Sequence, residues 1–364
     1  MALSSLLEPV AFADLPGWEE DDHASALSAF ERTASEAEGR AYRSGALGVA
    51  FSVLAETFQS FGPVKGADAR SFFESRFVPH RIRPEAGGRG FVTGYYEPIV
   101  AASRTETAAF PVPLYRQPDD LVKVTDDNRP PGLDKDLAFA RRGADGFEEY
   151  DDRAAIEAGA LKGRGLEIAW LADPVDAFFI HVQGCARLVM EDGSELRVTY
   201  AAKTGHPFTG PGRVLAGLGE IPCEAVTMQS IRAWFRANPH RVDEILHRNR
   251  SFIFFREAPV SDPALGPIAA AKVPLQPGRS LAVDRLLHTF GSPLFVSAER
   301  LDFEGSPFRR LMLAQDTGSA IMGAARGDIF TGSGDAAGEV AGVIKHEADF
   351  FLLVPRALSE GRER

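Results

Sequence analysis

Cysteine is almost missing from this chain, in which only Cys185 and Cys223 occur among 364 residues. Two cysteines are too few for a disulfide framework or a cysteine-based metal cluster, and we expect two unpaired, mostly buried thiols. No apolar run approaches the roughly 20 residues that a membrane-spanning helix needs. The N-terminus also lacks the basic start and sustained apolar segment of a signal peptide, and it lacks a cysteine that could carry a lipid. We therefore expect a soluble chain.

A basic surplus is missing too. The formal net charge of -11 at pH 7 argues against a nucleic-acid partner, which would require a basic face. With 45% hydrophobic and 25% charged residues, the composition is that of an ordinary globular protein, and the length allows two domains. The histidines show no spacing typical of metal ligands, so we expect no metal site.

The hydrophobic pattern changes along the chain. Between residues 20 and 80, apolar residues recur at spacings of three and four, which predicts amphipathic helices, the first capped by Asp22. Residues 104 to 165 are polar and rich in proline, which indicates a crossing between domains or a long surface loop. From 166 to 213 we expect a small β region, with strands over LEIAWLAD and AFFIHVQGCARLVM and a hairpin turn at Asp192.

A tyrosine pair beside a glutamate stands in the segment RGFVTGYYEPIVAAS, residues 89 to 103. We expect a strand that bends at Gly94, so that Tyr95, Tyr96 and Glu97 are exposed or half-exposed at its end. Aromatic rings stack on sugar faces while a carboxylate accepts hydrogen bonds, so this group suits a sugar groove. Aromatic pairs also often simply pack, and both interpretations stay open.

Three aspartates dominate the last third of the chain. Asp284, Asp316 and Asp328 each follow a short apolar run or lie in a glycine-rich turn. A carboxyl group held in this way can be partly desolvated, and its pKa can rise towards the range of a general acid. Asp316 and Asp328, twelve residues apart across one hairpin, could form the carboxylate pair of a glycosidase, or one acid with an orienting partner. The string DTGS at 316–319 also resembles an aspartic protease signature, but a second copy is missing and only a dimer could supply it.

Several blocks of the sequence resemble the lytic murein transglycosylase A (MltA) family. The last block resembles its 3D domain, named for three aspartates that Asp284, Asp316 and Asp328 match. The matching blocks lie in family order over roughly residues 90 to 355: TGYYEP, LEIAWLADPVDAFFIHVQG, GHPFTGPGR, NRSFIFFRE, VPLQPGRSLAVDR and AQDTGSAIMGAARGDIFTGSGDAAGEVAG.

The resemblance implies a mainly β fold with N-terminal helices. It implies a double-psi β-barrel built from both chain ends, a small inserted β-barrel domain, and a glycan groove between them. We place the first part of the barrel domain with the helices at residues 1–106, the insert at 107–247, and the rest of the barrel, with the 3D domain, at 248–364.

The resemblance also implies a reaction, the non-hydrolytic cleavage of the β-1,4 bond between N-acetylmuramic acid (MurNAc) and N-acetylglucosamine (GlcNAc) in peptidoglycan. Asp328 would be the catalytic acid, and Asp316 would orient it and raise its proton affinity by like-charge repulsion. Asp284 would support both, or would form a structural salt bridge with Arg285. No metal and no organic cofactor is required. We expect the glycan to contact six further residues: Tyr95, Tyr96, Glu97, Gln183, Gly184 and His206.

The sequence departs from the family pattern near Gln183. Cys185 and Ala186 stand where a serine and a glycine are usual, which casts doubt on a backbone conformation that needs glycine at 186. Phe208 stands where a tyrosine is common. The alternatives are a hydrolytic glycosidase and a non-catalytic peptidoglycan-binding module. Because peptidoglycan lies outside the inner membrane, we expect a periplasmic or outer-membrane-associated protein. We expect a monomer whose partners are glycan strands and possible cell-wall synthesis or hydrolysis complexes.

Overall fold

The computed structural model describes residues 2–59, 68–85, 87–135, 137–144, 146–303 and 305–359. The chain divides into two compact units. Unit 1 is built from both chain ends, Met1–Tyr96 and Asp262–Arg364, and unit 2 is the segment between them, Glu97–Ser261. Unit 2 is wider than the expected insert at 107–247, because β4 (Ile99–Ser103) and β12 (Ile253–Ala258) are strands of its sheet.

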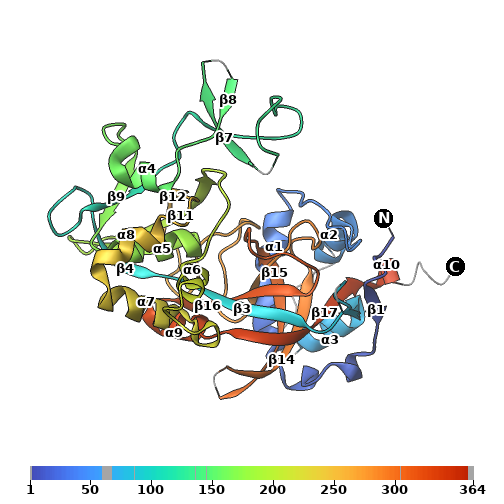
Figure 1. Cartoon of the computed structure of the whole chain (residues 1–364). Helices are drawn as coiled ribbons and strands as arrows, with labels where there is room; N and C mark the ends of the chain where they lie inside the picture. Colours follow the sequence, from blue (N-terminus) through green and yellow to red (C-terminus); the bar gives the residue numbers. More distant parts are fainter. Residues whose placement is uncertain are drawn as a thin grey trace. The chain divides into compact units, whose positions relative to one another are not determined.

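Six strands of unit 1 close into a barrel. The ring runs from β17 through β14, β15, β13, β16 and β3 and returns to β17, and β2 and then β1 are added next to β17. Figure 1 labels β3, β14, β15, β16 and β17 of this ring. Closure pairs the backbone of each ring strand on both sides and leaves no free edge in the ring. The mainly β fold with a barrel from both chain ends is therefore confirmed. Its strands are β1 Leu7–Pro9, β2 Phe77–Ile82, β3 Gly90–Glu97, β13 Ser280–Val283, β14 Pro293–Phe303, β15 Ser306–Asp316, β16 Arg326–Ser333 and β17 Lys345–Pro355.

The N-terminal helices form as the apolar spacing predicts. They are α1 (His23–Ala37), α2 (Phe51–Gln59) and α3 (Ala69–Arg76), and the Asp22 carboxylate caps α1 by accepting from the Ser25 N–H at 3.1 Å. Phe30 of α1 is fully buried, and its ring packs edge-on against Phe58 at a centroid distance of 4.9 Å. The helices share one hydrophobic core with the barrel strands, so the two chain ends stabilise each other. Two short helices complete unit 1, α9 (Asp335–Ala341) and α10 (Arg356–Ser359).

Unit 2 contains a six-stranded sheet in the order β12, β11, β10, β4, β9, β5. An isolated bridge between Arg116, just after β5, and Phe255 of β12 joins its two ends. A smaller sheet of β6, β7 and β8 occupies the proline-rich stretch that we expected to be a crossing or loop. The remaining strands are β5 Val112–Tyr115, β6 Leu121–Lys123, β7 Phe139–Gly143, β8 Gly146–Glu148, β9 Glu167–Leu171, β10 Cys185–Met190 and β11 Glu195–Lys203. The helices are α4 Arg153–Ala155, continued by a π-helical turn at Ile156–Ala160, α5 Pro174–Gln183, α6 Pro211–Gly217, α7 Met228–Ala237 and α8 Val242–Leu246.

One strand prediction in unit 2 is wrong. The run AFFIHVQ forms the helix α5 instead of a strand, and only β10 after it is extended. Asp173 caps this helix by accepting from the Val175 N–H at 2.7 Å, Pro174 occupies its first turn, and Gly184 ends it with a φ of 74°. These three signals determine the helix, because an apolar run alone does not distinguish a buried helix from a buried strand. The hairpin of β10 and β11 turns at Gly193, as expected.

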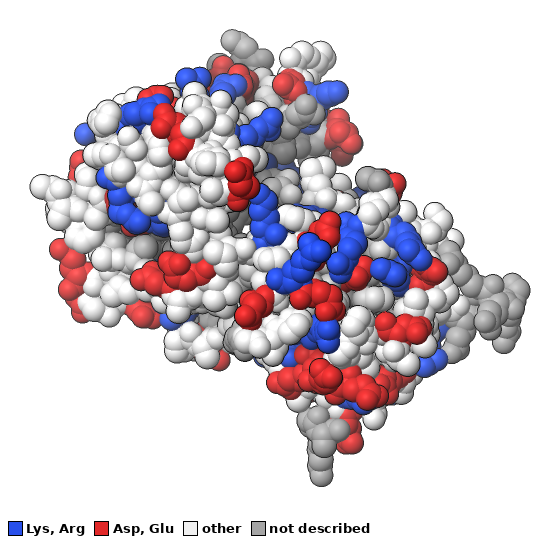
Figure 2. All heavy atoms as spheres, turned by 60° about the horizontal axis from the view of Figure 1, so that its bottom comes forward, with Lys and Arg blue, Asp and Glu red and all other residues white. Residues whose placement is uncertain are grey.

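The charged surface and the burial of the two cysteines can be compared with what the composition predicts. Figure 2 shows acidic and basic side chains interspersed over much of the drawn face. Cys185 is buried as expected, whereas Cys223 is exposed because it begins an exposed turn. In the described part of the chain, no helix is long and apolar enough to cross a membrane.

Candidate active site

Asp316 and Asp328 lie on the two strands that flank β13. Ala282 of β13 is the register partner of Asp316 at the end of β15 and also of Asp328 in β16. Register partners project to the same face of a sheet, so both carboxyl groups share one face. The expected hairpin contact is therefore corrected, because β13 inserts between the two strands. Two strand spacings place the two Cα atoms about 10 Å apart.

A hydroxyl group holds the carboxyl of Asp328. Thr93 of β3 donates its Oγ1–H to Asp328 Oδ1 at 2.5 Å. The same hydroxyl accepts from Arg326 Nη2 at 2.7 Å, so its own proton is directed at the carboxyl. Burial raises the pKa of Asp328 above the usual range of aspartates, although the Thr93 hydrogen bond and the Arg326 charge act in the opposite direction. This carboxyl therefore keeps its proton to higher pH than an ordinary aspartate does.

Asp316 has a different set of partners. Tyr95 donates its hydroxyl to Asp316 Oδ2 at 3.0 Å, and the Ala270 N–H donates to Oδ1 at 3.3 Å. Burial is the largest cause that raises the pKa of Asp316 to about 6, and the charge of Asp328 adds to it. The two carboxyls are therefore electrostatically coupled.

The like-charge effect is smaller than the effect of burial. Burial is the main cause of the raised pKa at both Asp316 and Asp328, and the charge of Arg326 lowers the pKa of Asp328. Repulsion between two carboxylates is mutual, so the expected rise in the proton affinity of Asp328 through Asp316 stays a prediction.

Asp284 organises loops next to this pair. Its carboxylate accepts from the Leu286 N–H at 3.0 Å and from the Gly323 N–H at 2.9 Å, and so joins the turn after β13 to the loop that leads into β16. His288 makes a second connection between the same segments through Nε2, which lies 2.8 Å from the Ala324 carbonyl oxygen. The alternative salt bridge with Arg285 does not occur among the described residues. Asp284 therefore fits a supporting role, through backbone hydrogen bonds.

The predicted exposure of Tyr95, Tyr96 and Glu97 is wrong. Their exposed fractions are 7%, 5% and 0%. Tyr95 and Tyr96 are buried because β3 is a ring strand of the barrel, whereas Glu97, at the end of β3, is buried among residues of unit 2. Gly94 is not a bend but lies inside β3, where a Cβ atom would come within 2.9 Å of the Ala341 Cα. Tyr95 reaches the candidate site with its hydroxyl, as described above, whereas Tyr96 packs against Gly338 of α9.

Glu97 makes a buried ion-pair cluster in unit 2. Its carboxylate accepts from Arg197 Nε at 2.5 Å and from Arg187 Nη2 at 3.2 Å, and both arginines are almost fully buried. The two arginines are register partners on β10 and β11, so Glu97 separates two like charges that face each other. This arrangement gives Glu97 a structural role, because its charge stabilises unit 2.

The remaining predicted contact residues all lie in unit 2, and their contact with glycan stays a prediction. Gly184 ends α5 in a left-handed conformation, and its carbonyl oxygen accepts from the Tyr200 N–H at 2.7 Å. Gln183, the last residue of α5, is half-buried. His206 is buried, with Nε2 at 2.8 Å from the Tyr150 carbonyl oxygen. Ala186 is a buried residue of β10 with an ordinary negative φ, so this position does not require the glycine that is usual there.

Sequence reasoning missed Thr93 and Arg326. Thr93 and Tyr95 are two residues apart on β3, so both side chains project to one face, where they reach Asp328 and Asp316 respectively. This period of two is visible in TGYYEP and could have identified Thr93. Arg326 is the first residue of the strand that carries Asp328. Its position two residues before Asp328 was the only feature of the sequence that could have identified it as a site residue. Among the described residues, no group of three or more histidine, cysteine, aspartate or glutamate side chains could hold a metal ion.

Fold and site together define a mainly β protein with a candidate general-acid centre in its barrel. Comparison with known proteins gives the family. Residues 91–256 match the MltA specific insert domain, and residues 279–354 match the 3D domain. A membrane-bound lytic murein transglycosylase from Agrobacterium tumefaciens has a crystal structure with 49% identity and a TM-score of 0.91, over 98% of this chain and 99% of that one. The chain belongs to the lytic murein transglycosylase A family.

Two further relatives come from Escherichia coli. Membrane-bound lytic murein transglycosylase A of strain K12 is 34% identical over 270 residues, which are 72% of this chain. The match spans 64% of that curated relative, slightly less than two thirds of its length. The crystal structure of Escherichia coli MltA with bound chitohexaose has a TM-score of 0.69 and 25% identity, over 98% of this chain and 96% of that one.

Proposed function

We propose that this chain is a peptidoglycan lytic transglycosylase. It cleaves the β-1,4 bond between MurNAc and GlcNAc without water and leaves 1,6-anhydroMurNAc ends, as part of cell-wall turnover. The observation that carries the proposal is Asp328, whose raised pKa and short hydrogen bond from Thr93 suit a positioned general acid. Membership of the family and the likeness to a relative that binds chitohexaose support the substrate class.

Asp328 carries both proton transfers of the reaction. In its protonated form it gives its proton to the bridging oxygen, so that the GlcNAc residue leaves as an alcohol while an oxocarbenium-like muramyl cation develops. The C6 hydroxyl of the same muramyl residue then attacks C1, and the Asp328 carboxylate takes the hydroxyl proton. The nucleophile is already attached to the substrate, so one carboxylate is sufficient and its protonation state is restored at the end.

The neighbours of Asp328 prepare it for this role. Thr93 fixes the carboxyl and stabilises the carboxylate that forms after the first proton transfer. Asp316, held by the Tyr95 hydroxyl, orients the site and is electrostatically coupled to Asp328. Asp284 supports the loop that leads into β16 through its bond from Gly323.

A hydrolytic glycosidase is the main alternative. The flanking positions of Asp316 and Asp328 around Ala282, about 10 Å apart at Cα, allow a carboxyl separation in the range used by glycosidases. In that case Asp316 would activate a water or attack C1, and a reducing muramic acid would form. A non-catalytic peptidoglycan-binding module is the third candidate, but it has no use for an acid of raised pKa.

We place the protein in the periplasm or at the outer membrane, because its substrate lies outside the inner membrane and its relatives are named membrane-bound. Its partners are peptidoglycan glycan strands and, in the cell, complexes that synthesise or hydrolyse the wall. We expect a monomer, and no metal or organic cofactor enters the proposed reaction.

The end group of the products tests the proposal. Purified sacculi are digested with wild type and with Asp328→Asn, and the products are analysed by mass spectrometry. We expect anhydro-ended muropeptides from wild type and a rate lower by a factor of about 10² to 10⁴ for the variant. Reducing ends would identify a hydrolase with a second catalytic carboxyl, and no release by the folded wild type would favour the binding module.

A further inference from the structure

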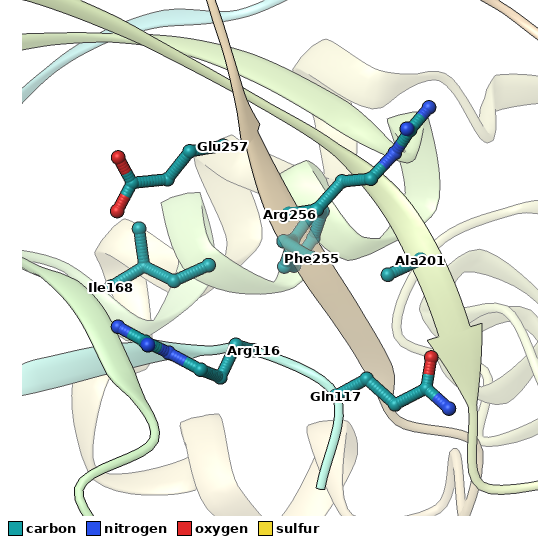
Figure 3. A pocket seen from close by; sticks show the side chains of 7 residues that line it. All are labelled: Arg116, Gln117, Ile168, Ala201, Phe255, Arg256 and Glu257. Carbon is teal, nitrogen blue, oxygen red and sulfur yellow. The ribbon is translucent and has the colours of Figure 1, made fainter. Parts of the chain in front are cut away.

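A pocket of about 470 Å³ opens in unit 2 where the six-stranded sheet closes on itself (Figure 3). The two ends of this sheet meet through the single bridge between Arg116 and Phe255 instead of a continuous ladder. A seam held by one bridge leaves side chains on both sides uncovered. The volume lies within the range of small-ligand sites, roughly 300–1,000 Å³.

The pocket has an apolar floor and a charged rim. Phe255 and Ile168 form the floor and are themselves buried at 0% and 4% exposure. The rim carries Arg116, Arg256 and Glu257, with the amide of Gln117 beside them. An apolar floor with a few polar groups around it is the usual composition of a ligand site.

The two rim arginines have no counter-charge. In the described part of the chain, the guanidinium groups of Arg116 and Arg256 make no hydrogen bond and no ion pair, although both residues are exposed. Arginines elsewhere in unit 2 are commonly paired, for example Arg232 with Asp176 at 2.6 Å. Glu257, the only acidic lining residue, is paired with Arg104 at 3.3 Å. The rim therefore offers two free positive charges in a chain whose net charge is -11.

The directions of the two arginines indicate the shape of the ligand. In Figure 3 the side chains of Arg116 and Arg256 leave the Phe255 floor towards different sides of the pocket. They are thus suited to two separate anionic groups and not to a bidentate grip on one. Guanidinium groups pair well with carboxylates, and the floor between them would accept methyl or methylene groups.

We propose that this pocket binds the peptide stems of peptidoglycan. The inference rests on the proposed function, which supplies the substrate class. The sugar rings of the glycan are uncharged, whereas its peptide stems carry several carboxylates separated by short aliphatic side chains. Two separated arginines over an apolar floor match that pattern. Unit 2 thus recognises the peptide stem, so that glycan strands with peptide stems bind more tightly than glycan strands without them.

Binding of a free peptide tests the inference independently of glycan cleavage. The probe is a synthetic stem tetrapeptide, L-Ala-γ-D-Glu-diaminopimelate-D-Ala, titrated into the full chain by isothermal calorimetry, and the same peptide with its carboxylates amidated is the matched ligand. The variant is Arg116→Gln with Arg256→Gln. The control is Arg213→Gln with Arg248→Gln, an equal change of charge at another pocket of the same unit.

We expect the double variant to bind the tetrapeptide at least about fivefold more weakly than wild type, while the control keeps wild-type affinity. Amidation should weaken binding to wild type by a similar factor. No binding by wild type, equal binding of the amidated peptide, equal weakening in the control, or full displacement by inorganic phosphate at the peptide's concentration would each overturn the inference. If wild type binds the peptide but releases no anhydro-ended products from sacculi, the peptide site is supported and the proposed lytic activity is contradicted.

Discussion

The two units of this protein bury carboxyl groups in opposite ways. In unit 2, Glu97 is fully buried between Arg187 and Arg197 and accepts hydrogen bonds from both guanidinium groups. In unit 1, Asp328 receives its hydrogen bond from the neutral hydroxyl of Thr93. Among the described residues, Arg326 donates to that hydroxyl and to the Gly327 carbonyl oxygen, and no hydrogen bond joins it to the Asp328 carboxyl. One carboxylate is compensated by direct positive charge and the other is not.

This difference separates a structural group from a chemical one. Glu97 between two arginines is held by two ion pairs, which compensate the cost of burying its charge. A carboxyl that is desolvated without a direct counter-charge keeps its proton to higher pH, which is what an acid catalyst needs. Both groups lie near the same strand, β3, since Thr93 belongs to it and Glu97 ends it. One strand therefore contributes to both the stability and the proposed chemistry.

Glu97→Gln gives the largest expected effect on stability. The amide cannot neutralise Arg187 and Arg197, which face each other as register partners, so the free energy of unfolding should fall by about 3–5 kcal/mol. Urea unfolding followed by circular dichroism measures it. The matched control is Glu257→Gln, which removes an exposed pair with Arg104 and should cost less than about 1 kcal/mol. Equal losses in the two variants would show that the buried cluster does not stabilise unit 2.

Thr93→Val acts on the uncompensated carboxyl. Without the hydroxyl, the carboxylate formed after proton transfer loses a charge-assisted hydrogen bond, so kcat should fall by about tenfold to a hundredfold. The same bond lowers the pKa of Asp328 in wild type, so the pKa rises further in the variant and the fall in activity at high pH should move to higher pH. Release of anhydro-muropeptides as a function of pH measures both changes.

Thr93→Ser is the control for that experiment, because it keeps the hydroxyl and removes only a methyl group. It should restore both the rate and the position of the pH profile. If Thr93→Val lowers the rate but leaves the pH profile in place, and serine does not rescue it, Thr93 is only a packing residue of β3.

Much of this architecture could be predicted from the sequence, because the relevant signals are local. The spacing in α1 to α3 and the Asp22 cap are helix signals within one turn, and the family blocks order the barrel strands. The error at α5 came from weighing its apolar content above Asp173, Pro174 and Gly184, which mark the two ends of a helix. Local end signals decide between helix and strand where periodicity does not.

The site was harder to predict because its contacts are long-range. The bond between Thr93 and Asp328 joins residues 235 positions apart, and the cluster of Glu97 with Arg197 joins residues 100 positions apart. No spacing rule relates such pairs. Tyr95 and Tyr96 are buried because β3 is a ring strand of the closed barrel, and the Tyr95 hydroxyl donates to Asp316. A contact of Tyr95 with a sugar stays a prediction.

Asp316→Asn has the smallest expected effect. It tests how much the free energy of unfolding is lowered by burying a carboxylate without a counter-charge. Asp316 has a folded-state pKa of about 6 against an ordinary value of 3.8, so the folded state binds its proton more tightly than the unfolded state. The destabilisation by its charge is absent below pH 3.8, grows as the pH rises to about 6 and is then constant. Because asparagine does not titrate, the stability of the variant relative to wild type should increase by about 1–2 kcal/mol between pH 4 and pH 7.5, with allowance for a half-buried side chain.

A control carboxyl with a lowered pKa should not show this change. In Asp192→Asn the relative stability should stay nearly constant over the same pH range, because hydrogen bonds from Ser194 lower the pKa of Asp192 and its stabilisation is lost only as the pH falls below the ordinary value of 3.8. Urea unfolding of both variants and wild type at the two pH values measures the difference. A relative stability of Asp316→Asn that does not change with pH would mean that Asp316 is already ionised at pH 4. The coupled, partly protonated pair with Asp328 would then not exist, and Asp328 would act without the support of its neighbour.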